Sequence, residues 1–331
     1  MTIKKFVFFA LIFTIIILLF RKESINILNK YFFEQSFTYD RGYWIKNDNL
    51  NPKLVFLGSS MTRHTIIPDI IAKNSNLKQG DIVNLGMNAA TPYEMYLTFK
   101  KNIDSFKNTK VVFYNLDPWI FSKKYYVHKK YEKALWTYEE WEKYSNDKGL
   151  KNYLNYKTTL FKESISKQEY SKPSFKDFGY EPLECKEEYK LETKEVIEDF
   201  FKDIINDGNH AISFFQLEYL KKLKQIVEAN NSKFVILYVP NQESYTKNIN
   251  EFNSDYNKSL EYHLNKYLGD TIQHGTFCPS IIGLENKLDF FDRHHLCDNG
   301  AKKYSFYLGD IFTTITNLKP IKFNINYMCF K

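Results

Sequence analysis

Short, continuously apolar runs alternate with amphipathic stretches along most of this chain, and this alternation is the feature that most limits how it can fold. Four such runs lie within LVFL at 54–57, DIVNLG at 81–86, KVVFYNLDP at 110–118 and KFVILYVP at 233–240, and a shorter KLDFFD lies at 287–292. Continuously apolar runs are typical of strands buried on both faces of a parallel sheet. The sequence therefore predicts about five parallel strands.

Helices are predicted between these strands from apolar residues at helical spacing. The first is the least regular, because Lys100 interrupts the face that Tyr93, Tyr96, Leu97 and Ile103 share, with Phe99 at its edge. The other stripes are Leu217, Leu220, Leu223, Ile226 and Val227; Phe252, Tyr256, Leu260 and Leu264; and Ala301, Tyr304, Leu308, Ile311, Phe312 and Ile315. Strands that alternate with helices predict a three-layer α/β/α sandwich, whose ligand site lies at the carboxyl ends of the strands.

An unbroken apolar run from Phe6 to Phe20 sets the N-terminus apart from the rest of the chain. At about 1.5 Å per residue it falls slightly short of a hydrocarbon core of about 30 Å, but Ile3 and the flanking lysine stems extend its reach. A cleaved signal peptide is the competing interpretation, although RKESINILNKYFF offers no small-residue cleavage site. We expect residues 1–22 to be one transmembrane helix, 23–51 a stalk, and 52–331 a single domain.

Residues of about 122–209 interrupt the strand–helix alternation with a charged and aromatic segment, which we interpret as an insertion that covers the site. It contains Trp136 and Trp141 among several tyrosines. Aromatic faces stack on sugar rings, so one hypothesis is a glycan-binding surface. Their helical spacing favours the alternative, which is packing within the insertion.

The formal net charge of +7 is spread along the chain without a basic stripe, so nucleic-acid binding is not predicted. A weak attraction to anionic surface polymers or lipid headgroups is compatible with this charge.

Four cysteines without a CxxC pair could form disulfides in three pairings if the domain is exported: Cys185, Cys278, Cys297 and Cys329. Cys297 stands close to His294 and His295, which raises the question of a metal site. The spacing matches no zinc pattern, so neither a metal nor a cofactor is predicted.

The first stretch that could carry out catalysis is LVFLGSSMTRH, in which Ser60 follows the strand-ending Gly58 by two residues. A serine at a strand-to-helix turn exposes its hydroxyl and leaves its backbone N–H free for an oxyanion. The alternative is that Ser59 or Ser60 only caps the next helix. Arg63 is a candidate substrate-binding residue for an anionic group, or the partner of a surface carboxylate.

The second stretch is FFDRHHLCDNGAKKYSFYL, where Asp292 precedes His295 by three residues. A carboxylate that accepts from one imidazole nitrogen leaves the other nitrogen to take a serine's proton. The alternative is that His294 and His295 form a surface pair at the start of a helix.

Together these stretches resemble the SGNH, or GDSL-type, hydrolase superfamily. GSS at 58–60 stands where that family has GDS, which implies that Ser60 is the nucleophile and contributes its backbone N–H to the oxyanion hole. DRHHL resembles the last family block and implies Asp292 and His295 as the acid–base pair. VNLGMNAAT resembles the second block, which implies Gly86 as an oxyanion donor and places Asn84 beside it at the substrate.

The third family block, usually GxND, is replaced by YNLDP. Asn115 is the implied side-chain donor, or else Asp117 occupies that position, where an ionised carboxylate would repel an oxyanion. These departures resemble a membrane-anchored branch of the superfamily. Its members work beside multi-spanning membrane-bound O-acyltransferases and move acyl groups onto exported polysaccharides or teichoic acids.

The resemblance implies a cofactor-free serine acyltransferase or esterase that acts through an acyl-enzyme on ester groups, above all O-acetyl groups. The implied partners are a cell-surface glycan or anionic polymer, the bilayer and a multi-spanning O-acyltransferase. The implied location is the cell membrane, with a single pass and the catalytic domain outside the cytoplasm. The alternative is a catalytically degenerate SGNH-like domain that serves as an anchored glycan-binding or assembly subunit.

Overall fold

The structure is a computed structural model that describes residues 50–123, 136–145, 147–157, 176–185, 199, 212–246, 254–309, 314–315 and 317–325. The chain divides into two compact units, one of Met1–Tyr39 with Lys129–Pro173 and one of Asp40–His128 with Ser174–Lys331. Each unit is considered by itself. The predicted anchor and all of the predicted stalk but its last two residues lie outside the described residues.

Among the helices that the structure describes, none has both the length and the apolar character needed to cross a bilayer.

One parallel sheet of five strands, in the order β2-β1-β3-β4-β5, forms the centre of the second unit. The strands are β1 (Leu54–Leu57), β2 (Ile82–Asn84), β3 (Val111–Asn115), β4 (Lys233–Tyr238) and β5 (Ile272–Gly275). Leu57 at the end of β1 pairs with Tyr114 of β3. The chain runs from β1 outward to β2 and then back across to β3, so its direction of winding changes beside the carboxyl end of β1. Ligands bind at such switch points in open α/β sheets.

The four longer apolar runs each contain a strand, as predicted, but the predicted fifth strand at 287–292 is wrong. Those residues form turns, with Phe290 in an isolated bridge to Leu296. The fifth strand is IQHG at Ile272–Gly275, whose four residues are all partly exposed at the edge of the sheet. β2 also lies at an edge of the sheet but is fully buried, whereas β5 is partly exposed along its whole length. The sequence of β5 therefore lacks the continuous apolar run on which the prediction relied.

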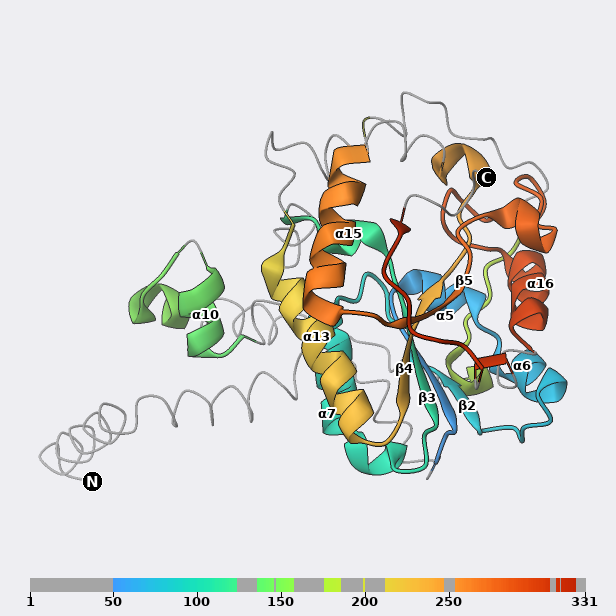
Figure 1. Cartoon of the computed structure of the whole chain (residues 1–331), viewed down its shortest axis with the longest axis horizontal. Coiled ribbons are helices and arrows are strands. Elements are labelled where there is room, and N and C mark those ends of the chain that lie inside the picture. The colour runs from blue at the N-terminus through green and yellow to red at the C-terminus, as the bar shows by residue number, and fades with distance from the viewer. Residues whose placement is uncertain are drawn as a thin grey trace, which may run out of the picture. The chain divides into compact units, whose positions relative to one another are not determined.

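Helices cover both faces of the sheet (Figure 1). One face packs against α7 (Pro92–Lys101), α13 (Phe214–Ala229) and α15 (Ser254–Leu268). The other packs against α5 (Ser60–Thr65), α6 (Pro68–Asn74) and α16 (Asp298–Leu308). Short 3-10 helices lie at Ile103–Phe106, Pro118–Phe121, Lys176–Gly179 and Pro279–Ile282. Sequence neighbours in β1 point to opposite faces, so Val55 packs on the first side and Phe56 on the second.

The predicted stripes of three helices are confirmed where the structure describes them. The buried members are Leu217, Leu220, Leu223 and Val227 in α13; Tyr256, Leu260 and Leu264 in α15; and Ala301, Tyr304 and Leu308 in α16. Phe252, Ile311 and Phe312 lie outside the described residues.

The predicted face of α7 is only partly right: Tyr93 is buried, and Tyr96 and Ile103 pack against the core, but Met95 and Leu97 were misplaced. The side chains that join the core against the sheet are Met95 and Phe99, with Thr98 buried between them. Leu97 is only partly buried, and Tyr93 is enclosed by aromatic rings of α13, with its ring 4.5 Å from that of Tyr219. Because the polar Thr98 interrupts the sheet-facing stripe, the sequence pattern did not reveal Met95 as part of it.

The described part of the first unit contains α10 (Tyr138–Tyr144) and a helical stretch at 150–157. Trp136 and Trp141 lie 6.3 Å apart in a T-shaped contact, and the Trp141 ring lies 5.7 Å from Tyr153. All three side chains are at most 2% exposed. These rings therefore pack against one another, as the packing alternative expects, and the indole faces are not open to a sugar. Whether the insertion covers the site stays a prediction.

The corrected face of α7 can be tested with two substitutions in the same helix. Met95→Ala should lower the free energy of unfolding by about 2–5 kcal/mol, because it leaves a cavity against the sheet. Leu97→Ala is the matched control and should cost about 1 kcal/mol or less, because its side chain is partly solvated. Urea unfolding of the purified protein measures the free energy of unfolding of both variants, and equal losses in the two would contradict the assignment.

Candidate active site

A sharp turn at the end of β1 places Ser60 at the first position of α5. Gly58 makes this turn with φ +155°. A Cβ there would lie 2.2 Å from Thr62 Oγ1 and 2.9 Å from the Cβ of Asn115, so no larger residue fits without displacing its neighbours. The close approach of β1, β3 and α5 therefore requires glycine at this position.

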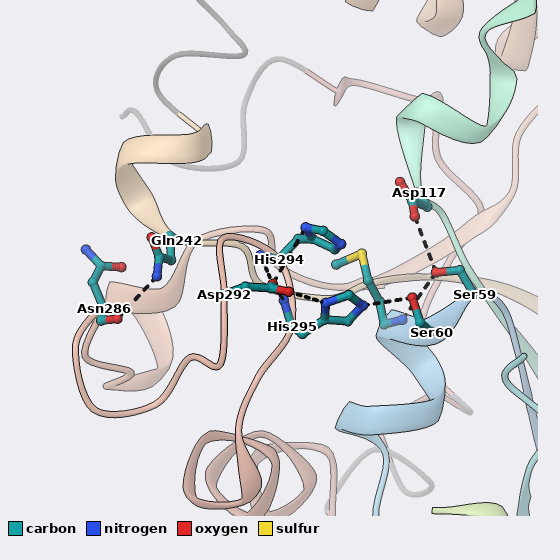
Figure 2. Close-up of polar contacts among 9 residues, drawn as sticks. Ser59, Ser60, Asp117, Gln242, Asn286, Asp292, His294 and His295 are labelled. Atoms are coloured by element: carbon teal, nitrogen blue, oxygen red, sulfur yellow. Dashed lines mark hydrogen bonds and ion pairs between the residues drawn. The ribbon is translucent and has the colours of Figure 1, made fainter. Parts of the chain in front are cut away.

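The helix-capping alternative describes Ser59. The Ser59 hydroxyl accepts a hydrogen bond from the Met61 N–H at 3.3 Å and donates one to Asp117 Oδ2 at 3.3 Å (Figure 2). Asp117 precedes the 3-10 helix Pro118–Phe121 and is 6% exposed. Its carboxylate thus holds Ser59 in place, and a carboxylate oxygen in this role cannot donate a hydrogen bond to an oxyanion. The alternative of Asp117 as the oxyanion donor is therefore not supported by its position.

The Ser60 hydroxyl lies in a line of hydrogen bonds with the two residues that the DxxH spacing singled out (Figure 2). Ser60 Oγ is 2.8 Å from His295 Nε2, and His295 Nδ1 is 2.8 Å from Asp292 Oδ2. Because a carboxylate only accepts, the Nδ1–H donates to Asp292, and Nε2 is left to accept from the serine. The structure thus brings Ser60, Asp292 and His295 together with the atoms ordered for proton transfer.

The Asp292 carboxylate is oriented by the turn in which it lies. Its Oδ1 accepts the backbone N–H of His294 at 3.0 Å and that of His295 at 2.8 Å, so the oxygen that faces the imidazole is fixed. Burial would raise the pKa of Asp292, but the hydrogen bond from His295 and the two adjacent imidazoles outweigh it and hold the pKa well below its usual range. The carboxylate therefore stays ionised at neutral pH.

His294 lies beside the line and not within it. Its ring centroid is 4.0 Å from that of His295 and 6.1 Å from that of Tyr245. Burial and the neighbouring His295 lower the pKa of His294 to about 3, which leaves this imidazole neutral at physiological pH. The two adjacent histidines are therefore not equivalent, and only His295 meets Ser60.

Asn84 and Gly86, the predicted substrate-binding residue and oxyanion donor, are both engaged in hydrogen bonds within the protein. Asn84 is fully buried, and its Nδ2 donates to the carbonyls of Thr62 at 2.8 Å and Ile66 at 2.9 Å, so it secures the end of α5. Its Oδ1 accepts the Gly86 N–H at 2.9 Å. That N–H is therefore already engaged and is not presented as an open oxyanion donor. The spacing of the block could not reveal this, since the Asn84 side chain reaches back to a different element.

Asn115, by contrast, offers an uncommitted amide. It is 1% exposed at the carboxyl end of β3, beside Gly58, and neither atom of its side-chain amide has a hydrogen-bond partner in the described part of the chain. Buried amides are nearly always paired, so an unpaired one beside Gly58, two residues before Ser60, is consistent with a donor for a bound ligand.

Arg63, the candidate for binding an anionic substrate group, forms an ion pair with Glu181. The alternative of a carboxylate partner thus describes it. Glu181 was not singled out from the sequence, because it lies in the predicted insertion and carries no recognisable motif.

Cys185 and Cys297 form a disulfide across a sequence separation of 112 residues. Of the three pairings that the sequence allows, the structure therefore has the one that joins Cys185 to Cys297. Because Cys297 is in a disulfide, it is not available as a thiolate metal ligand. Asp292, His294 and His295 offer ligand atoms within 4.8 Å of one another. Both ring nitrogens of His295 are already hydrogen-bonded, so the arrangement matches a proton relay better than a metal centre.

No protein-family model matches the chain, and no curated protein matches it. Among solved structures it is similar to a lipolytic protein of the G-D-S-L family from Desulfitobacterium hafniense DCB-2, with 11% identity, a TM-score of 0.35, and coverage of 79% of this chain and 99% of the other. It is also similar to a GDSL-like lipase from Bacteroides thetaiotaomicron VPI-5482, with 11% identity, a TM-score of 0.36, and coverage of 85% of this chain and 99% of the other. A third similar structure is that of an acylhydrolase from Bacteroides fragilis NCTC 9343, with 13% identity, a TM-score of 0.36, and coverage of 84% of this chain and 97% of the other. At these TM-scores the likeness carries no argument about function.

The lowered pKa of His294 predicts a loss of stability in acid. Below about pH 6.5 the unfolded chain binds a proton on this residue that the native protein does not bind until about pH 3, so acidification favours unfolding. Between about pH 6.5 and 4.5 the wild type should lose about 2 kcal/mol more unfolding free energy than His294→Gln, which cannot titrate. Urea unfolding at both pH values measures the difference. Parallel losses in the two proteins would show that His294 is protonated normally in the native state.

Proposed function

We propose that this protein is a serine esterase or acyltransferase of the SGNH type, in which Ser60 is the nucleophile and His295 the general base. The observation that carries the proposal is the line of two 2.8 Å hydrogen bonds from Ser60 Oγ through His295 to Asp292. In this order the imidazole can take the hydroxyl proton while the ionised carboxylate stabilises the imidazolium that forms.

Two steps follow from this arrangement. In the first, His295 Nε2 takes the Ser60 proton as Oγ bonds to the carbonyl carbon of an ester. The alcohol then leaves with that proton, and the acyl group stays on Ser60. In the second step a sugar hydroxyl or water gives its proton to His295 and attacks the acyl carbon. The C–O bond to Ser60 breaks, and His295 returns the proton to Oγ. The acceptor decides whether the result is transfer or hydrolysis.

Two donors are available for the carbonyl oxygen that becomes negative in each step. Ser60 opens α5, so its N–H lies outside the hydrogen bonds of the helix. The Asn115 amide supplies a second donor from the end of β3. Donors that are fixed before the reaction stabilise the developing charge without reorganisation, and one such donor is worth about 3–4 kcal/mol elsewhere. The Gly86 N–H would join them only by leaving Asn84.

The finer proposal concerns the substrate and the location. The run Phe6–Phe20 anchors the protein in the cell membrane by a single pass, and the catalytic domain lies outside the cytoplasm. The Cys185–Cys297 disulfide supports this location, because structural disulfides are typical of oxidising compartments. The substrate is then an O-acyl ester, above all O-acetyl, of a cell-surface polysaccharide or teichoic-acid-like polymer. A multi-spanning membrane-bound O-acyltransferase is the partner that would supply the acyl group.

The nucleophile is tested by labelling the purified soluble domain with a fluorophosphonate, which reacts with activated serines. Ser60→Ala should abolish labelling. Ser59→Ala is the matched control, because it removes the neighbouring hydroxyl but leaves the contact between Ser60 and His295, and it should still be labelled. Labelling that survives Ser60→Ala, with peptide mapping to another serine, would disprove the assignment.

Transfer and hydrolysis make opposite predictions in the cell. With Ser60→Ala substituted in the chromosomal gene, a transferase predicts that ester-linked acyl groups on purified surface polymer are lost. A deacylase predicts that these groups increase. An unchanged acyl content would instead favour the non-catalytic alternative, a domain that binds or assembles glycan.

A further inference from the structure

The segment 176–185, called the strap from here on, returns from the predicted insertion and contacts both sides of the proposed catalytic pair. Its first residues form the 3-10 turn Lys176–Gly179, in which Asp177 and Phe178 have left-handed φ values of 50° and 54°. Non-glycine residues in this region cost about 1–2 kcal/mol each. Local backbone preferences therefore do not stabilise the conformation of the strap. Its contacts with the rest of the unit must stabilise it.

On the serine side the strap binds the last turn of α5 through Glu181. The Glu181 N–H donates to the Arg63 carbonyl at 3.3 Å, and the two side chains form an ion pair. The His64 Nδ1–H donates to the Glu181 carbonyl at 2.7 Å. A helix of only six residues has little stability of its own, so these contacts help to fix the element that begins at Ser60.

On the base side the strap binds the start of α16, three residues beyond His295. Tyr180 Oη donates to Asp298 Oδ1 at 2.8 Å, and the Asp298 N–H donates to the Leu183 carbonyl at 2.8 Å. The Cys185–Cys297 disulfide then fastens the strap covalently only two residues after His295.

The two sides meet at His64. Its ring lies edge-on to that of His295, with centroids 5.6 Å apart and planes at 86°. Because the Glu181 carbonyl fixes the His64 ring, the strap also sets one wall of the space in which the His295 imidazole lies. Ser305 of α16 separately bonds the Thr65 carbonyl and the Ile67 N–H, so the far end of α5 stays attached to α16 without the strap.

From these contacts we infer that the strap is a positioning element that keeps His295 within hydrogen-bond reach of Ser60. His64 and Glu181 are its positioning residues on the serine side, and the Cys185–Cys297 disulfide is its fastening on the base side. The inference rests on the proposed function of Ser60 and His295. It makes the reactivity of the serine depend on the oxidation of one disulfide, since reduction frees the strap from the loop that carries the base.

The test uses the double variant Cys185→Ser/Cys297→Ser of the full-length protein in detergent, together with His64→Ala and His64→Asn. Fluorophosphonate labelling is measured at a temperature well below the melting points of all the proteins, and the maximal rate is separated from reagent affinity. The double variant and His64→Ala should label at least tenfold more slowly, with affinity changed less than twofold, because a displaced base slows the chemical step. His64→Asn should recover part of the rate, because its amide can still donate to Glu181.

A maximal labelling rate within twofold of the wild type in the double variant would overturn the inference. A fall in labelling rate no larger than the fraction of unfolded protein would overturn it as well. A second readout keeps this result separate from a failure of the proposed function. The Nδ1 proton signal of His295 in NMR reports its hydrogen bond to Asp292 and its ordering whether or not Ser60 reacts. It should be sharp in the oxidised protein and broadened in the double variant. If Ser60 of the wild type does not label at all, the proposed function fails. If the His295 signal is unchanged in the double variant, the positioning role of the strap is rejected, whatever the result for Ser60.

Discussion

The contact of three backbone segments around Gly58 is the constraint on which the rest of the site depends. β1 and β3 lie in register up to Leu57 and Tyr114, and α5 begins almost at once beyond them. There is no room for a side chain at Gly58, and the same holds at Gly86, where a Cβ would lie 2.4 Å from the Arg63 nitrogen. These two approaches direct Ser60 out of the sheet at the edge where Asn115 and the Asp292–His295 turn also end.

The electrostatics of the site follow from placing one carboxylate between two imidazoles. Asp292 is held ionised by its hydrogen bonds and neighbours, while burial keeps His294 neutral. When His295 gains a proton, its positive charge is therefore balanced by Asp292 and not opposed by a second imidazolium. A charged His294 at a ring distance of 4.0 Å would resist that proton. The lowered pKa of His294 thus leaves His295 without a charged imidazole beside it.

The sequence was informative wherever structure depends on residues close together in the chain. Buried strands, β2 at the sheet's edge included, appear as apolar runs, and Asp292 and His295 share one tight turn, so both were predictable. The edge strand Ile272–Gly275 was not, because partial exposure removes the apolar signature. The side-chain contacts of Asn84 were not predictable either, since they reach residues about twenty positions back along the chain. The strap was missed because its bond to His64 joins residues 117 positions apart. Spacing within a motif carries no information about such contacts.

The distance along the chain between the two hydrogen-bonded partners has a consequence for biosynthesis. Ser60 and His295 are separated by 235 positions, and ribosomes add roughly 5–20 residues per second. The serine is therefore made roughly 10–50 s before the histidine that would activate it. During that interval a growing chain carries an inert hydroxyl, whatever esters surround it. On the proposed function, reactivity would appear only once the turn that carries His295 has been made and has docked beside Ser60, so synthesis of this late segment would itself serve as the activation step.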